Sequence, residues 1–208
     1  MVSFILIISR TSQNVLEVIK KLPGNIKDEE YFWSKIKLSD QAIFYYRGIL
    51  SFKSSLPTGK IIVMGDLYKE FNKELRECSE EDLNYILQSG GQHLIQHYWG
   101  NYISIIHNTS TNQLTILRAP VGACSCFYFI DSEKIIVFSS LQDVQQFLPK
   151  ELSLNENFII KALCYHRVIT EETGLNNIKI LSSGQALIIR DTEYTTRWFW
   201  DPLKYCST

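Results

Sequence analysis

The sequence has few of the features that define several common protein classes. It contains no CxxC pair, and its cysteines are an odd set at irregular spacing (Cys78, Cys124, Cys126, Cys164 and Cys206). Neither a disulfide framework nor a zinc ribbon is therefore predicted. The chain also lacks an excess of charge, because its formal net charge is −1 and both signs are spread along it. Without a basic stripe, we expect no nucleic-acid partner.

Long hydrophobic runs are missing as well. The N-terminal apolar run FILII has five residues and no basic segment before it, whereas a membrane-spanning helix needs about 20 apolar residues. We therefore expect no signal peptide, no membrane association and a cytoplasmic location. The 208 residues are enough for one large domain or two small ones, and a chain of this size buries roughly 70% of its unfolded surface.

The hydrophobic pattern changes along the chain from isolated strands and helices to a series of hairpins. Strands are predicted at 2–9, 42–46 and 60–64, and turn residues at 51–59. Hairpins are predicted at 101–107 with 113–119, 125–131 with 133–140, and 185–190 with 194–200. Helices are predicted at 12–22, 79–87, 92–99, 141–148 and 155–166. Hairpins combined with helices in this order indicate an α+β layered fold.

One segment interrupts the alternation of the hairpins. It reads LRAPVGACSCFYF over 117–129 and contains Arg118, Pro120 and Gly122 between two apolar runs. Proline fixes φ, and glycine adopts conformations that other residues avoid. We call residues 118–124 the Arg-Pro-Gly turn and predict that it connects two hairpins.

With its flanks, this segment resembles the glutaminase domain of the asparagine synthetase family, the class II glutamine amidotransferases. That family has a G-x-[FY] strand, a hairpin, the sequence R-D-P-x-G-x-x-P-[LC]-[FY]-Y, a second hairpin, and S-S or S-E before a helix. The residues in step are Gly100, Tyr102, Arg118, Pro120, Gly122, Cys126, Tyr128, Ser139 and Ser140. The resemblance spans about 60–202 and ends at Trp200-Asp201-Pro202, although Ala119 replaces the family's Asp. Cys126 and the Thr-Gly-Leu segment at 173–175 further resemble the lasso-peptide macrolactam synthetases.

The resemblance implies a four-layer αββα Ntn-hydrolase-like sandwich of two antiparallel sheets, with 1–208 as a single glutaminase-like domain. It also implies a contact between the Arg-Pro-Gly turn and a synthetase domain. The alternative for Arg118 is a purely structural role at the surface or between sheets.

The same resemblance implies a catalytic cysteine as the first residue after Met removal, whose thiol attacks glutamine and whose α-amine acts as base. This chain has Val2 at that position, so no catalytic residue is predicted. The family's oxyanion Asn-Gly aligns with Met64-Gly65, which leaves only a backbone donor. Glu80 and Arg47 correspond to the groups that bind the amine and carboxylate of glutamine, or else are a helix-capping carboxylate and a solvated strand residue.

No metal site is predicted from the sequence. His93 and His97 are four residues apart on a predicted helix, but no third ligand is evident. The Cys124-x-Cys126 pair is expected at the edge of the core.

Three functions remain open from the sequence. The first is a degenerate, inactive glutaminase-like domain that supports an ATP-dependent amide-forming domain or subunit, with ATP and Mg bound only there and a precursor peptide as a further partner. The second is an independent peptide- or metabolite-binding module. The third is a hydrolase activated by processing to an internal Ser or Cys.

Overall fold

The computed structural model describes residues 3–11, 14–21, 33–70, 73–74, 78–165, 170–191 and 193–201. The chain divides into two compact units, each built from segments that are distant in sequence. The first unit comprises Ser3–Arg47 and Ser125–Ser182, and the second comprises Gly48–Cys124 and Ser183–Thr208. Each unit contains one six-stranded antiparallel sheet.

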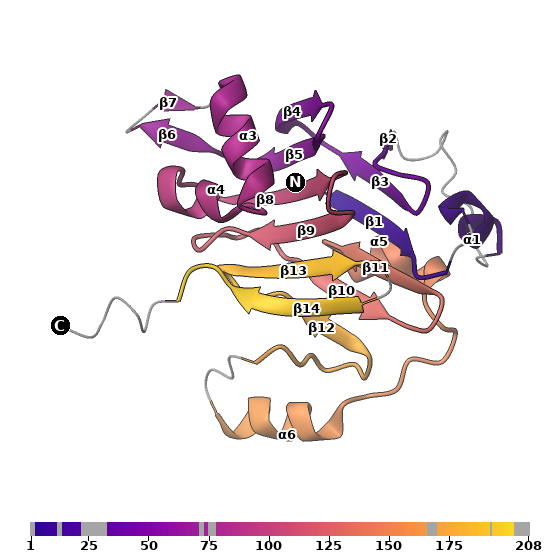
Figure 1. Ribbon diagram of the computed structural model, residues 1–208. Helices are drawn as coiled ribbons and strands as arrows, with labels where there is room; N and C mark the ends of the chain where they lie inside the picture. Colours follow the sequence, from indigo (N-terminus) through magenta and orange to yellow (C-terminus); the bar gives the residue numbers. More distant parts are fainter. Residues whose placement is uncertain are drawn as a thin grey trace. The chain divides into compact units, whose positions relative to one another are not determined.

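The first unit is organised around the N-terminal strand (Figure 1). Its strands, in spatial order, are β12 (Ile178–Ile180), β10 (Phe127–Ile130), β11 (Lys134–Phe138), β1 (Ser3–Ser9), β3 (Ala42–Arg47) and β2 (Ser34–Lys37). All seven residues of β1 are buried. A strand covered on both faces reads as a continuous apolar run, which explains why SFILIIS does not alternate.

Helices pack on one face of this sheet. They are α1 (Val15–Lys21), α5 (Leu141–Val144) and the 3-10 turn η1 (Gln145–Phe147). Val15, Val144 and Phe147 form a cluster with Ile7 and Ile43 of the strands. A further helix, α6 (Glu156–Cys164), has no buried residue.

The second unit contains the other sheet and a short ribbon. The sheet order is β14 (Glu193–Trp198), β13 (Gln185–Arg190), β9 (Gln113–Arg118), β8 (Tyr102–Asn108), β5 (Gly59–Gly65) and β4 (Leu50–Leu56), and the ribbon pairs β6 (Tyr68–Glu70) with β7 (Lys73–Glu74). The hairpins β8–β9 and β13–β14 are neighbours, because β13 pairs with β9.

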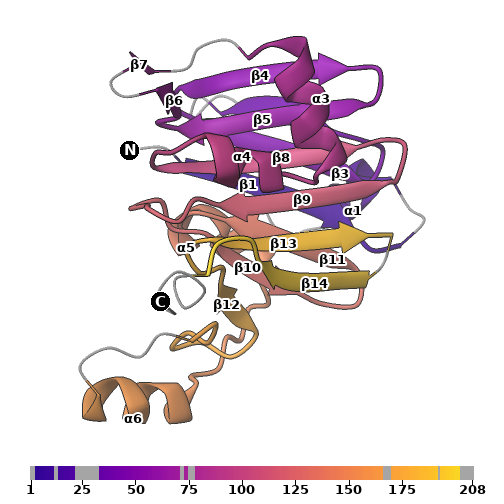
Figure 2. The same cartoon turned by 60° about the vertical axis from the view of Figure 1, so that its left-hand side comes forward.

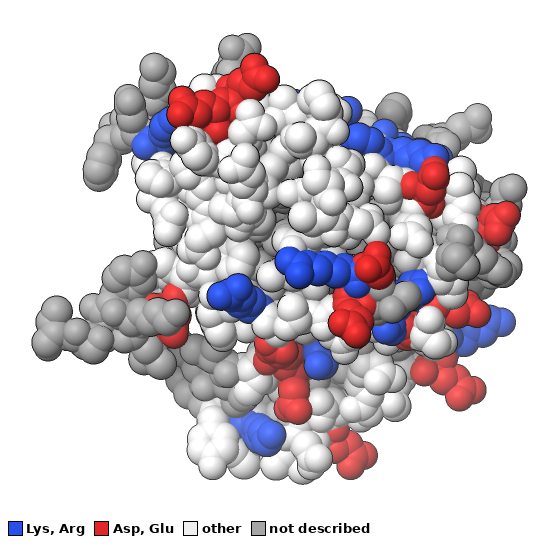
Figure 3. All heavy atoms as spheres, viewed as in Figure 1, with Lys and Arg blue, Asp and Glu red and all other residues white. Residues whose placement is uncertain are grey.

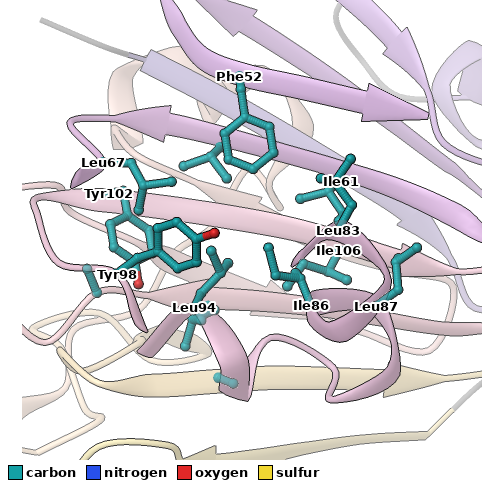
Figure 4. Close-up of a cluster of buried hydrophobic side chains, with 14 residues drawn as sticks. Phe52, Ile61, Leu67, Leu83, Ile86, Leu87, Leu94, Tyr98, Tyr102 and Ile106 are labelled. Carbon is teal, nitrogen blue, oxygen red and sulfur yellow. The ribbon is translucent and has the colours of Figure 1, made fainter. Parts of the chain in front are cut away.

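Two helices, α3 (Glu80–Gln88) and α4 (Gln92–His97), lie over β5 and β8 (Figure 2). Ile86 and Leu94 of these helices pack with Ile61, Tyr102 and Ile106 of the sheet (Figure 4). Burial of such side chains is worth roughly 1.5–3 kcal/mol each. Burial of these apolar side chains therefore fixes α3 and α4 on this face of the sheet.

The predicted α+β fold with two antiparallel sheets is confirmed, as is helical cover over one sheet from residues 80–98. The prediction of turn residues at 51–59 is wrong, because β4 occupies Leu50–Leu56 and only 57–58 form the turn. β4 is an edge strand in which Phe52 is the buried residue. Its remaining Ser and Lys residues tolerate solvent, so the apolar signal of a strand is weak. The prediction of a single domain stays a prediction.

In the described part of the chain, no helix is long and apolar enough to cross a membrane.

Candidate functional site

The start of β1 lies beside an arginine. Arg47, the last residue of β3, pairs with Ser3 across the sheet, and its Nη2 donates a hydrogen bond to Ser3 Oγ at 3.4 Å. The resemblance implies a nucleophile immediately before Ser3, at Val2, which lies outside the described residues. Arg47 is therefore placed at the end of β1 where the family chemistry would occur.

Arg47 already has a carboxylate partner within its own unit. Its Nη2 is 3.8 Å from Asp143 Oδ1, and its guanidinium carbon stands 5.2 Å from the ring centroid of Trp33. The Asp143 side chain is 17% exposed, and its buried Oδ2 has no hydrogen-bond partner among the described residues. Because a buried carboxylate is costly without a countercharge, Arg47 stabilises Asp143. A substrate carboxylate would have to compete with Asp143 for this arginine.

The Met64-Gly65 pair ends β5 in the second unit. Met64 is 2% exposed and pairs with Ile103, while Gly65 pairs with Tyr102. A thioether donates no hydrogen bond, so this position offers no side-chain donor for an oxyanion. Gly65 has φ +95°, and a Cβ there would lie 2.2 Å from the carbonyl oxygen of Asn101. Glycine is thus required by the close approach of two backbones.

Asn101 joins this strand end to the Arg-Pro-Gly turn. Its carbonyl accepts the N–H of Asp66 at 2.9 Å, and its side-chain Oδ1 accepts the N–H of Cys124 at 3.3 Å. Within the turn, Arg118 Nη2 donates to the carbonyl of Gly122 at 3.4 Å. These contacts give Arg118 a local structural role, and Pro120 between them is half-buried. Sequence reasoning missed Asn101, whose only signal is its position after Gly100 at the start of a strand.

Glu80 lies elsewhere in the second unit, in the first turn of α3. The helix begins as predicted, because the N-cap Ser79 Oγ accepts the N–H of Asp82 at 3.2 Å. Glu80 is exposed, and its carboxylate forms no hydrogen bond or ion pair with another described residue. Acidic side chains in the first turn of a helix favour its dipole, so this placement accounts for Glu80 without a ligand.

The acidic residue of this region that forms side-chain contacts is Asp82, which sequence reasoning did not single out. Its carboxylate contacts Lys69 Nζ of β6 at 2.5 Å and His93 Nε2 of α4 at 3.2 Å, and accepts a hydrogen bond from Ser79 Oγ at 2.9 Å. Tyr98 is a further hydrogen-bond partner. We call these five residues the Asp82 cluster.

Burial by itself would raise the pKa of Asp82, but the hydrogen bonds of the Asp82 cluster outweigh it and hold the pKa well below its usual range. Burial raises the pKa of Tyr98, as do its neighbours Cys78 and Asp82. Burial likewise raises the pKa of the Cys78 thiol, whose Sγ is 3.3 Å from Tyr98 Oη. The cluster thus contains an ionised Asp82, and the Cys78 thiol beside it stays protonated, which favours a structural role for Cys78 over a nucleophilic one.

The structure brings only some of the predicted site residues together. Met64 and Gly65 are linked to the Arg-Pro-Gly turn through Asn101. Glu80 forms no such link, and Arg47 belongs to the other unit. Their assignment to a glutamine pocket stays a prediction.

Two residue pairs that resemble metal ligands in the sequence have structural explanations. The rings of His93 and His97 are 4.2 Å apart, but His93 is bound to Asp82. Cys126 is buried, and Cys124 is half-buried with its pKa raised by burial. No group of three or more His, Cys, Asp or Glu side chains within the described ranges is arranged to hold a metal ion.

Two solved structures of low identity share part of their chain with this protein. One is a glutamine phosphoribosylpyrophosphate amidotransferase from B. subtilis complexed with ADP and GMP, with 13% identity, a TM-score of 0.46, and coverage of 95% of this chain and 43% of that one. The other is described as the allosteric regulatory enzyme of purine biosynthesis, with 10% identity, a TM-score of 0.46, and coverage of 96% and 43%. This chain thus spans less than half the length of either structure. No curated protein matches it.

A family model gives the stronger result. The model described as "Glutamine amidotransferase domain" matches residues 56–200, which is more than half of the chain. This range contains the Met64-Gly65 pair, the Arg-Pro-Gly turn and Trp200, the residues on which the resemblance rests. The chain therefore belongs to the glutamine amidotransferase domain family.

Proposed function

We propose that this chain is a degenerate glutaminase-like domain that does not release ammonia from glutamine and instead supports an ATP-dependent amide-forming domain or subunit. The partner is of the asparagine synthetase or macrolactam synthetase type. The carrying observation is Val2, which has no nucleophilic atom at the position where the family chemistry needs a thiol and a free amine on one residue.

The surroundings of the family pocket support the loss of activity. Met64 removes the side-chain oxyanion donor, and loss of one such donor alone costs roughly 2.7–4 kcal/mol in the barrier. Arg47 is occupied by Asp143, and Glu80 points to solvent in the first turn of α3. Val2 and Met64 thus replace two groups that the family chemistry needs, and the contacts of Arg47 and the exposure of Glu80 offer no prepared site for glutamine.

Exposed apolar side chains in the Arg-Pro-Gly turn and in β14 support the partner role. In the Arg-Pro-Gly turn, Val121 is 74% exposed, and in β14 Trp198 is 45% exposed. Phe199 and Trp200, which follow β14, are only partly buried, and so is Phe127 in the other unit. Exposed apolar side chains of this kind favour a protein contact when they gather in patches. In this proposal the partner binds ATP and Mg, and the amine acceptor or donor is a small molecule or a precursor peptide.

The test of inactivity is ammonia release. The purified chain with glutamine should release no more ammonia than a buffer blank, while an active class II amidotransferase assayed in parallel provides the positive control. Turnover at ordinary enzyme rates would refute the proposal.

The test of the partner role is direct binding. The resemblance implies that the ATP-binding domain of such a partner carries a pyrophosphate loop with the sequence SGG-x-D-S. The partner is therefore the chain or domain with this loop, identified from coding sequence in frame or adjacent. We expect a complex with this partner in sedimentation, weakened by Val121→Glu. Binding of glutamine or a peptide without any such complex would favour the independent binding module instead.

A further inference from the structure

Helix α6 and the loop that follows it stand apart from the core of their unit. We call residues 150–165 and 170–177 the α6 arm. Figures 1 and 2 both show α6 beyond β12, the edge strand of its sheet. None of the nine residues of α6 is buried, although five of them are apolar (Phe158, Ile159, Ile160, Ala162 and Leu163).

The arm exposes large apolar side chains to solvent. Leu154 is 63% exposed, Ile160 58%, Leu163 82% and Tyr165 66%. Their summed exposed area is on the order of 500 Å², which sets the upper limit for one apolar patch on the arm, and the largest patch on a typical monomer is about 300–600 Å². Ile160 and Leu163 are three apart and therefore project from one side of the helix.

The contacts of the arm with itself fix the helix but leave these side chains free to bind. Asn155 caps α6 by accepting the N–H of Phe158 at 3.1 Å, and its own N–H donates to the carbonyl of Gly174 at 3.0 Å. Lys161 Nζ is 3.7 Å from Glu172 Oε2 in the following loop. A helix this short is marginal in water without burial of an apolar face, so its stability is expected to rise on docking.

The area of the patch argues against a second copy of this chain as the occupant. Two copies that met through this patch would bury at most about 1,000 Å² in total, below the roughly 1,200–2,000 Å² of stable interfaces. A different partner that also binds another surface of this chain would need only part of its interface from the arm. The charge pattern fits an apolar groove, because Lys161 is already paired with Glu172, and the region of α6 at the bottom of Figure 3 is mainly uncharged.

We propose that the α6 arm inserts Ile160 and Leu163 into an apolar groove of the synthetase partner. This inference rests on the proposed function. It gives the partner a second contact, in addition to the one with the Arg-Pro-Gly turn. Recognition of a helix through apolar anchors at i and i+3 in a groove is a common binding mode. The Asn155 cap and the contacts of the arm with itself hold α6 before binding, which reduces the ordering cost.

A natural cysteine reports on the arm. Cys164 is exposed at the C-terminal end of α6, next to Leu163, and trypsin releases it in the peptide Ala162–Arg167. The experiment measures the alkylation rate of Cys164 by N-ethylmaleimide, by mass spectrometry of this peptide. The 208-residue chain is compared alone and in complex with the partner that carries SGG-x-D-S. We expect at least tenfold slower alkylation in the complex.

Matched variants test the anchor. Leu163→Glu should weaken the complex at least tenfold, while Ile49→Glu, at an equally exposed aliphatic residue outside the arm, should change it less than twofold. Neither variant should alter the far-ultraviolet circular dichroism of the chain, because both side chains are largely exposed.

The outcomes separate the two proposals. A complex in which Cys164 reacts as fast as in the free chain overturns the arm contact and leaves the proposed function standing. If no complex forms, both are overturned. A dimer of the isolated chain that protects Cys164 also overturns the arm contact, since the occupant is then a second copy.

Discussion

At the residue scale, Asp82 makes more contacts that stabilise its surroundings than Glu80, the acidic residue that the family resemblance indicated. Asp82 joins α3 to β6 through Lys69 and to α4 through His93. Lys69 is 46% exposed, so solvent screens its share of the interaction. The Asp82 side chain is 16% exposed, and hydrogen bonds to a charged group of this burial contribute more than surface ion pairs.

We predict that Asp82→Asn lowers the free energy of unfolding by roughly 1–3 kcal/mol at pH 7. The folded-state pKa of Asp82 is held below the unfolded value of about 3.9. Its contribution to stability is therefore fully present above pH 4 and is lost as the pH falls toward the folded-state pKa. Urea unfolding at pH 7, 4 and 3 should show the difference between wild type and variant shrinking with acid.

The matched control is Glu80→Gln, an acid-to-amide change in the same helical turn at an exposed carboxylate. It should cost about 1 kcal/mol or less, through the helix dipole alone. Equal losses for the two variants would show that Asp82 has no special role.

We predict a sharper effect for Gly65→Ala. The added Cβ would meet the carbonyl oxygen of Asn101 at 2.2 Å, at φ +95°. The unfavourable φ alone costs roughly 1–2 kcal/mol, and the backbone contact adds to it. Gly174→Ala is the control, because its Cβ would find Ile159 Cγ1 at 3.9 Å and no closer atom. Thermal unfolding should show a large loss for the first variant only, and similar melting temperatures would contradict the strained geometry.

At the scale of elements, local chemistry predicted the helices and hairpins well. The Ser79 cap, the break at Gly90-Gly91 and the three hairpins are present in the structure. Besides β4, the elements missed by the sequence are the short strands β2, β6, β7 and β12, which have two to four residues. Such strands bury little, so their sequences have no clear alternation, and they depend on neighbouring strands to form.

Two leucines in different helices should respond differently to truncation. Leu94 of α4 is fully buried in the cluster of Figure 4, whereas Leu163 of α6 is 82% exposed. We predict that Leu94→Ala lowers the free energy of unfolding by about 2–5 kcal/mol. Leu163→Ala should change it by less than about 0.5 kcal/mol in the isolated chain. Urea unfolding of both variants measures this, and a large loss for Leu163→Ala would mean that α6 packs against the rest of the chain.

At the scale of the whole molecule, the residues that the resemblance assigns to a glutamine pocket are divided between the two units, with Arg47 in the first and Met64 and Glu80 in the second. We predict that Val2→Cys combined with Met64→Asn does not restore glutaminase activity. The two substitutions leave Arg47 in contact with Asp143 and the Glu80 carboxylate exposed to solvent. Ammonia release should stay at the level of a buffer blank.

This test requires that Met1 is removed, because the chemistry uses the free α-amine, and intact mass spectrometry verifies the processing. Turnover of glutamine by the double variant would show that the two substitutions alone account for the loss. In that case the contact of Arg47 with Asp143 and the exposure of Glu80 would not contribute to the loss of glutaminase activity.

The sequence by itself determined the family, the two antiparallel sheets, the helix caps and the absence of a nucleophile at Val2, because each depends on a residue type or on local periodicity. Only the tertiary structure decided that Arg47 contacts Asp143, that Asn101 links Asp66 to Cys124, and that Asp82 rather than Glu80 forms side-chain contacts. These partners are separated by 11 to 96 residues, and no local pattern encodes such pairings. They arise because strand pairing and the packing of α3 and α4 on their sheet bring remote side chains together, and because burial then favours the pairs that satisfy one another's charge and hydrogen bonds.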